Sequence, residues 1–239
     1  MKIIIMGDIH ADFGALNRFI NKHRPAIILQ CGDFGWWPHH HLVERIRKNH
    51  FFDQYAIKLR GTSLYWCDGN HENHDDLQKR IGANQGGPIE IPVPGCYYMR
   101  RGSILTLDDG RNVLFFGGAM STDKDGRTEG ESWWPSEVPT SADLEYAKAQ
   151  VAAHGESVDI VISHTAPLRF LRQLPKNKIA RARLTDPTVA LLDMILDEFH
   201  PKKWFFGHFH LAVRGEDLGC AWRCMNAEGF GGGWWVELD

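Results

Sequence analysis

Short runs of apolar residues recur along this chain of 239 residues, and each is followed at once by polar residues. The first run, residues 2–6, is nearly all apolar and β-branched, which predicts a buried central strand. Further runs of the same kind occupy residues 26–31, 63–67, 158–163 and 203–206. We therefore expect five strands that are buried in the core.

The segments between these runs show helical spacing or carry turn residues. Apolar residues from Phe13 to Ile20 keep helical spacing. Asp12 is suited to the N-cap before them, and Pro25 ends this helix after residue 24. Further helices are expected to begin at residue 39 and to cover residues 72–81, 141–154 and 186–199. Loops are expected over residues 82–95 and 117–140, a hairpin around Asp109-Gly110, and closing antiparallel strands over residues 211–238.

The alternation of strands and helices predicts one α/β domain over residues 1–239, with two mixed sheets covered by helices. The residues that follow the five strand runs are of the kinds that bind metal ions. They are Asp8 and His10, Asp33, Asn70 and His71, His164, and His208 and His210. Ligands of α/β sheets bind beyond the carboxyl ends of the strands, so five strand ends can deliver these side chains to one crevice. Aspartate, asparagine and histidine without cysteine suit Mn²⁺, Fe, Zn²⁺ or Mg²⁺.

The succession D-x-H, G-D, G-N-H-E, an isolated His and G-H-x-H over residues 8–210 resembles the calcineurin-like metallophosphoesterases. The resemblance implies a four-layer αββα sandwich with a metal site at the C-terminal ends of the strands. It implies two divalent ions, of which Mn²⁺ is our first choice and Fe, Zn²⁺ or Mg²⁺ the alternatives. The first ion would be held by Asp8, His10, Asp33 and His210, and the second by Asp33, Asn70, His164 and His208.

The same resemblance implies hydrolysis of phosphate esters by in-line attack of a metal-bridging hydroxide. Asp33 would bridge the two ions, and His71, which has no metal in this scheme, would be the general acid. The sequence also departs from the family: Gly32-Asp33 is followed by Phe-Gly-Trp-Trp, without the Asp and Arg that serine/threonine protein phosphatases carry there. A protein phosphatase is therefore disfavoured, and what orients His71 stays open.

The G-H-x-H block resembles the phosphodiesterase branch of the family more than it resembles the protein phosphatases, so a phosphodiesterase is favoured. The alternative is a phosphomonoesterase or nucleotidase, and a non-catalytic interaction scaffold is a remote one, since no ligand is lost. Asn70 and Arg127 are the candidates for contact with the substrate. Arg127 lies on a long loop near Trp133 and Trp134, and its planar guanidinium can hold two phosphoryl oxygens. The competing interpretation is that the tryptophans pack the loop and Arg127 is solvated.

Composition and charge limit the possible partners. A net charge of −3 argues against strong binding of long nucleic acids, although not against a small, nucleotide-like phosphate ester. The basic run over residues 169–183 is expected to be a solvated face. No apolar run approaches the roughly 20 residues that span a bilayer, so no membrane is expected. The five cysteines lack zinc-finger spacing, and a cytoplasmic location is the expectation. The sequence does not indicate an oligomeric state.

Overall fold

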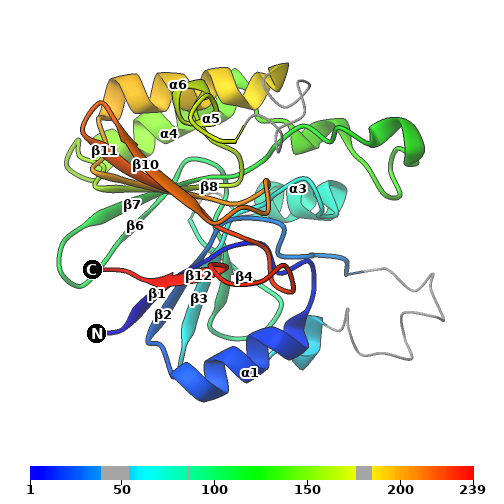
Figure 1. The fold of residues 1–239 in the computed structure, drawn as a ribbon. Coiled ribbons are helices and arrows are strands. Elements are labelled where there is room, and N and C mark those ends of the chain that lie inside the picture. Colours follow the sequence, from blue (N-terminus) through cyan, green and yellow to red (C-terminus); the bar gives the residue numbers. More distant parts are fainter. Residues whose placement is uncertain (39–53, 85–86, 176–184) are drawn as a thin grey trace.

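The computed structural model describes residues 1–38, 54–84, 87–175 and 185–239. In these parts of the chain the strands form two mixed sheets of six strands each (Figure 1). The first sheet has the order β12 (Trp235–Glu237), β1 (Ile3–Met6), β2 (Ile27–Gln30), β3 (Ser63–Trp66), β5 (Cys96–Tyr98) and β4 (Ile89–Glu90). The second has the order β10 (Val213–Asp217), β11 (Cys220–Cys224), β9 (Lys203–Phe206), β8 (Ile160–Ser163), β7 (Asn112–Phe116) and β6 (Ser103–Thr106).

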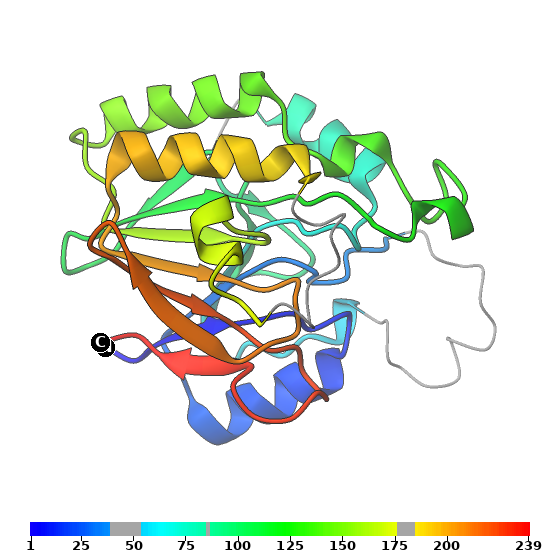
Figure 2. The same ribbon diagram turned by 45° about the horizontal axis from the view of Figure 1, so that its top comes forward.

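Helices cover the outer face of each sheet, which gives four layers (Figure 1). α1 (Phe13–His23) packs on the first sheet. α4 (Ser141–Ala153) and α6 (Pro187–Phe199) lie side by side on the second sheet, with α5 (Leu168–Leu171) next to them (Figure 2). A third apolar cluster, which includes Ile5 and Ile162, fills the space between the sheets. The four-layer αββα sandwich is therefore confirmed.

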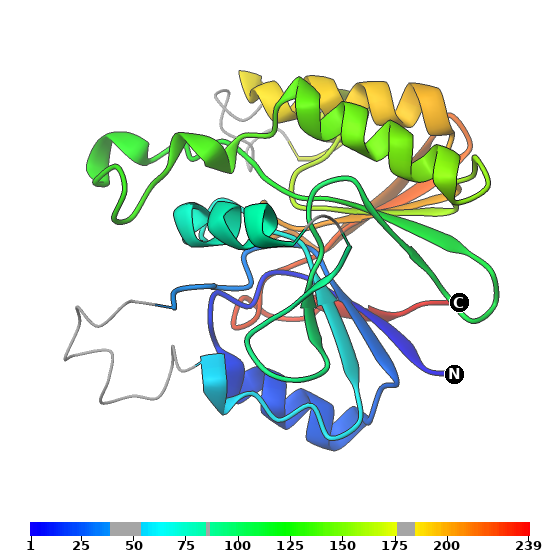
Figure 3. The ribbon, with the colours of Figure 1, turned by 180° about the vertical axis from the view of Figure 1, so that it is seen from behind.

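Helix starts follow from local residues. Asp12 Oδ1 accepts a hydrogen bond from the backbone N–H of Ala15, at 2.8 Å, and caps α1 as expected. α3 (His74–Ala83) begins two residues later than expected, because Asn73 Oδ1 accepts from the backbone N–H of Asp76 at 3.0 Å and occupies the N-cap. α3 contacts the short 3₁₀ helix η3 (Pro135–Glu137), which belongs to the long loop beside it (Figure 3).

Two expectations about strands were wrong. The stretch 82–95 is not all loop: β4 pairs with β5 because Ile89 places a buried side chain opposite Tyr98. In the closing segment, β10 and β11 are antiparallel as expected, but β11 lies parallel to β9. β12 leaves that sheet and pairs with β1 in the other one. Gly231 and Gly233, with φ of 97° and 87°, lie in the turn between the sheets, where side chains are disfavoured.

The helix expected from residue 39 lies outside the described residues, as do Lys176, Lys178, Arg181 and Arg183 of the basic run. Arg169 and Arg172 are described and exposed. In the described ranges we find no helix that is long and apolar enough to cross a membrane.

Candidate metal centre

The candidate site residues lie where the carboxyl ends of the parallel strands of both sheets meet. β1, β2 and β3 are parallel neighbours in one sheet, and β8 and β9 are parallel neighbours in the other. The backbone N–H of His208 donates to Asp8 Oδ1 and Oδ2, at 3.1 and 3.0 Å, which joins the two sheets at this edge. His10, Asp33, His208 and His210 have left-handed backbones, with φ of 45°, 50°, 65° and 50°. Such backbones are strained, and they cluster at functional sites.

Asp8, His10 and His210 form the first group. Asp8 Oδ2 lies 3.2 Å from His210 Nε2 and 3.8 Å from His10 Nε2. The two Nε2 atoms are 2.9 Å apart. Asp8 is fully buried, whereas both histidine side chains are about one-third exposed, at 32% and 29%. One side of this group is therefore open to solvent.

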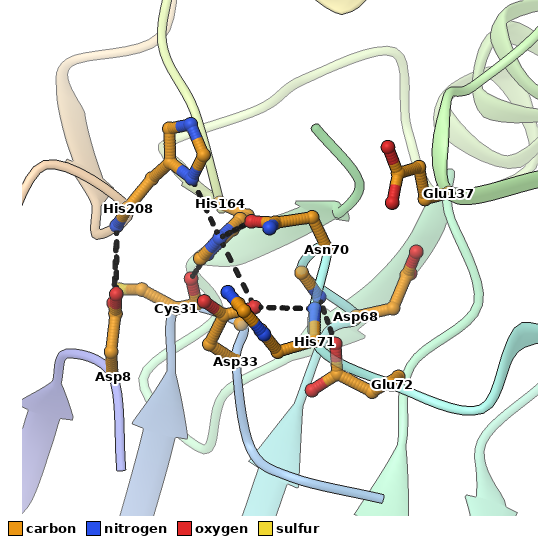
Figure 4. Close-up of polar contacts among 12 residues, drawn as sticks. Asp8, Cys31, Asp33, Asp68, Asn70, His71, Glu72, Glu137, His164 and His208 are labelled. Carbon is orange, nitrogen blue, oxygen red and sulfur yellow. Dashed lines mark hydrogen bonds and ion pairs between the residues drawn. The ribbon is translucent and has the colours of Figure 1, made fainter. Parts of the chain in front are cut away.

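The second group gathers around His164 Nε2 (Figure 4). This nitrogen lies 3.1 Å from Asn70 Oδ1, 3.3 Å from Asp33 Oδ1 and 3.1 Å from His208 Nδ1. The other ring nitrogen of His164, Nδ1, lies 2.9 Å from the carbonyl oxygen of Cys31. A carbonyl only accepts, so Nδ1 carries a proton, and Nε2 is directed at the group.

Asp33 joins the two groups. Its Oδ1 faces His164, while its Oδ2 lies 3.8 Å from His10 Nδ1. Burial alone would raise the pKa of Asp33, but His164, His71 and His10 lower it, and it ends well below its usual value. Burial alone would lower the pKa of His164, yet the Asp33 carboxylate raises it to about 10. The two shifts are reciprocal: the histidines stabilise the negative charge of Asp33, and the Asp33 carboxylate stabilises positive charge on His164.

The spacing of these atoms fits metal ligation. Ligands that bind one ion at about 2.0–2.2 Å and at right angles lie about 3 Å from one another. Five of the distances between candidate ligand atoms within the two groups are 2.9–3.3 Å. The donor atoms are carboxylate and amide oxygens and imidazole nitrogens, the set that suits Mn²⁺, Fe, Zn²⁺ or Mg²⁺.

His10, Asp33 and His71 form a third group that could hold a metal ion. The family resemblance, however, implies that His71 is the general acid and not a metal ligand. The backbone N–H of His71 donates to Asp33 Oδ1 at 2.9 Å. Arg127 Nη2 lies 3.1 Å from His71 Nε2 and also donates to Asp123 Oδ2 at 2.7 Å. Arg127 is therefore neither solvated nor remote, and it is a contact for the imidazole whose orientation the sequence left open.

The groups border a pocket of about 200 Å³. It is lined by Asp33, Asn70, His71, Thr122, Asp123, His208 and His210. Sequence reasoning did not single out the loop residues Thr122 and Asp123, which also face it. Their side of the pocket belongs to the long loop after β7, so this loop takes part in the site.

Sequence reasoning also missed buried acids behind the site. Glu72 accepts hydrogen bonds from the backbone N–H groups of Gly35, at 3.1 Å, and Gly69, at 2.8 Å. Its place in the G-N-H-E block was a signal that was not used. Glu137 is fully buried near Asn70 (Figure 4) and belongs to no motif, so no sequence signal pointed to it.

The sequence profile of the family described as calcineurin-like phosphoesterase matches residues 1–212. A solved Plasmodium structure, the anchor in the inner membrane complex, has a TM-score of 0.50 and 14% identity, over 94% of this chain and 70% of that one. A dimetal phosphatase from Danio rerio has a TM-score of 0.49 and 11% identity, over 95% and 87% of the two chains. The phosphopantetheinyl hydrolase from Mycobacterium tuberculosis has a TM-score of 0.47 and 12% identity, over 99% and 96%.

No curated protein matches the sequence. At such low identities the solved structures are similar in fold alone, whereas the family profile spans most of the chain and every candidate ligand. The chain therefore belongs to the calcineurin-like phosphoesterase family and is a metal-dependent hydrolase of phosphate esters.

Proposed function

We propose that this chain is a phosphodiesterase with two divalent metal ions, and that Mn²⁺ is the preferred metal. One ion would be held by Asp8, His10, Asp33 and His210, and the other by Asp33, Asn70, His164 and His208. The observation that supports this most directly is the convergence of seven side chains from five strand ends, with neighbouring donor atoms 2.9–3.8 Å apart. Asp33 Oδ1 faces His164 of the second group and Oδ2 faces His10 of the first, so this carboxylate is placed to bridge the two ions.

When bound, the two ions would lower the pKa of water at the site and neutralise charge on the phosphoryl group. Two divalent ions bring four positive charges, and Asp8 and Asp33 remove two. The remaining excess suits an anionic substrate such as a phosphate ester better than a neutral ester or amide.

Charge at the pocket favours a diester over a monoester. A diester phosphoryl carries one negative charge, whereas a monoester carries close to two at pH 7. No lysine or arginine is found among the described residues that line the pocket. The nearby charge of Arg127 is already compensated by Asp123, at 2.7 Å. Apart from the ions themselves, the second charge of a monoester would therefore find no uncompensated cationic side chain in this part of the structure.

His71 is the proposed proton donor to the leaving group. Arginine only donates hydrogen bonds, so a contact from Arg127 Nη2 leaves His71 Nε2 as the acceptor. A phosphoryl oxygen in the pocket would be a stronger acceptor for this guanidinium than an imidazole is. Substrate binding would then move Arg127 from His71 to the phosphoryl group and free His71 to carry and transfer a proton.

The test compares bis-p-nitrophenyl phosphate with p-nitrophenyl phosphate, after chelation and reloading with Mn²⁺. We expect two bound ions per chain and the higher kcat/KM on the diester. A higher kcat/KM on the monoester would establish a phosphomonoesterase instead. Two bound ions with no turnover of either ester would favour the interaction scaffold.

A further inference from the structure

The side chain of Asn70 is held by a chain of hydrogen bonds that leads away from the metal centre. Asn70 Nδ2 donates to Ser121 Oγ at 3.1 Å, and Ser121 Oγ donates to Glu137 Oε2 at 2.8 Å. All three residues are buried, with 5%, 1% and 0% exposure. Ser121 and Glu137 both belong to the long loop after β7, which is distant in sequence from Asn70.

The order of donors along this chain is dictated by chemistry. A carboxylate only accepts, so the hydroxyl proton of Ser121 goes to Glu137. Ser121 Oγ can then only accept from Asn70, which requires the NH₂ end of the amide at this position. The opposite end of the amide, Oδ1, consequently faces His164 Nε2, at 3.1 Å. Only this end can ligate a metal, because an amide NH₂ has no lone pair to offer.

Glu137 is held firmly enough to impose this order. Its Oε1 accepts from the backbone N–H of Ser121 at 2.5 Å and from the indole N–H of Trp133 at 2.8 Å. Its backbone carbonyl accepts from Arg101 Nη2 at 2.8 Å. Arg101 also donates to Asp68 Oδ2, at 2.8 and 2.6 Å, two residues before Asn70 (Figure 4 labels Asp68, Asn70 and Glu137). The loop and the turn that carries Asn70 are thus tied together twice.

We propose that Glu137 and Ser121 are positioning residues that set the direction of the Asn70 amide and so present its oxygen to the second metal ion. This inference rests on the proposed function, since it needs Asn70 as a ligand. It gives the tryptophan-containing loop a role: the indole of Trp133 helps to hold the carboxylate that orients a ligand.

The substitution Glu137→Gln reverses the direction of the hydrogen bond between residue 137 and Ser121, and it leaves the size and shape of the side chain nearly unchanged. The glutamine oxygen must stay where Oε1 accepts two N–H groups, so its NH₂ group faces Ser121 Oγ and donates to it. The proton of Ser121 then has no acceptor unless the Asn70 amide turns over, which would place NH₂ on the metal side. We expect one of the two Mn²⁺ ions to bind about 10–100-fold more weakly, the usual cost of losing a group that orients a ligand.

The decisive comparison repeats this change in an Asn70→Asp background. The new carboxylate at position 70 competes with Glu137 for the single proton of Ser121, so Asn70→Asp alone leaves two oxygens facing each other without a proton. Adding Glu137→Gln releases that proton to the new carboxylate. We therefore expect Glu137→Gln to weaken Mn²⁺ binding in the parent and to strengthen it in the Asn70→Asp chain, measured by calorimetric titration and by bound metal.

Glu131→Gln is the matched control, because Glu131 is an exposed acid of the same loop. It should bind Mn²⁺ like the parent, and thermal unfolding should show that all variants fold. If Glu137→Gln prevents folding, Ser121→Ala should weaken Mn²⁺ binding in the parent and not in the Asn70→Asp chain. If Glu137→Gln weakens Mn²⁺ binding by the same factor in both backgrounds, or does not weaken it in the parent, the inference is overturned. The proposed function would still stand in that case, provided that the parent binds two ions. A parent that binds no Mn²⁺ would overturn both.

Discussion

Replacing Arg127 with alanine tests whether the loop after β7 grips the substrate. In the structure the guanidinium donates to Asp123 Oδ2 from Nε and Nη2, at 3.0 and 2.7 Å, and Nη2 lies 3.1 Å from His71 Nε2. The Arg127 side chain is only 13% exposed, so the loop rather than solvent holds it. A phosphoryl group in the pocket would replace His71 as its partner, because phosphoryl oxygens are anionic and an imidazole nitrogen is not.

The size of the effect follows from these contacts. Two charge-assisted hydrogen bonds to phosphoryl oxygens contribute about 1.5–3 kcal/mol each, and the contact given up with His71 costs about 1 kcal/mol. The balance of about 2–5 kcal/mol predicts a loss of roughly 30- to 5,000-fold in kcat/KM for Arg127→Ala. Arg127→Lys should lose most of this too, because an ammonium group cannot hold two oxygens as a planar fork does.

The assay is turnover of bis-p-nitrophenyl phosphate at saturating Mn²⁺, with Lys124→Ala as the control for loss of one charge from the same loop. Parent-like kcat/KM in both Arg127 variants, with two ions bound, would refute the contact between Arg127 and the phosphoryl group. Arg169 and Arg172 would then be the next candidates for this contact. Asp123→Asn gives a second check, since it frees the charge of Arg127. The ratio of monoester to diester kcat/KM should rise, and an unchanged ratio would contradict the charge argument for a diester.

Chelation should abolish activity, and Mn²⁺ should restore it better than Ca²⁺, which prefers more oxygen ligands. The Asp33→Asn variant should bind fewer ions than the parent, as measured by mass spectrometry. Full turnover after EDTA treatment would contradict metal dependence. His71→Ala should keep two bound ions and lose about 10²–10⁴-fold in kcat on alkyl esters but less on p-nitrophenyl esters, whereas equal losses would indicate a positioning role. His74 is buried, and burial chiefly lowers its pKa from 6.5 to about 4. The folded state therefore holds neutral His74, and the parent should lose about 3 kcal/mol of unfolding free energy between pH 6.5 and pH 4. The His74→Leu variant should lose less unfolding free energy than the parent over this pH range, as measured by urea titrations. An equal loss in both proteins would show that His74 does not stay neutral in the folded state.

The strands that carry the site were predictable because their signals are local. Each apolar run became a parallel strand, and the polar residue after it came to lie at the sheet edge, as the rule for α/β folds requires. The N-cap at Asp12 and the turn at Asp109-Gly110 were equally local, and the structure has both the cap and the hairpin there. The two wrong expectations have different causes. β4 has only two residues, too few for a pattern to show. β11 has a second partner, β9, from an earlier part of the chain, and this pairing leaves no mark on the sequence of β11 itself.

The surroundings of the candidate ligands could not be predicted for the same reason. Ser121 meets Asn70 across 51 positions of sequence, and the pairing depends on how the loop after β7 returns across the turn. A close approach of the chain makes this possible: a Cβ at Gly117 would collide with backbone and side-chain oxygens of Asp68. A glycine in a glycine-rich loop is common, so this requirement becomes visible only once the two segments are seen together.

Two buried acids outside the proposed set of ligands hold the turns that carry the candidate ligands. Glu72 accepts from Gly35 and Gly69, which joins the turn of Asp33 to the turn of Asn70. Glu137 joins the turn of Asn70 to the loop that carries Arg127. The carboxyl oxygens of a buried acid are stabilised only while their hydrogen-bond donors stay in place, because their desolvation is otherwise uncompensated. Each acid therefore resists displacement of the two segments it connects, and we expect the candidate metal ligands and Arg127 to move together or not at all.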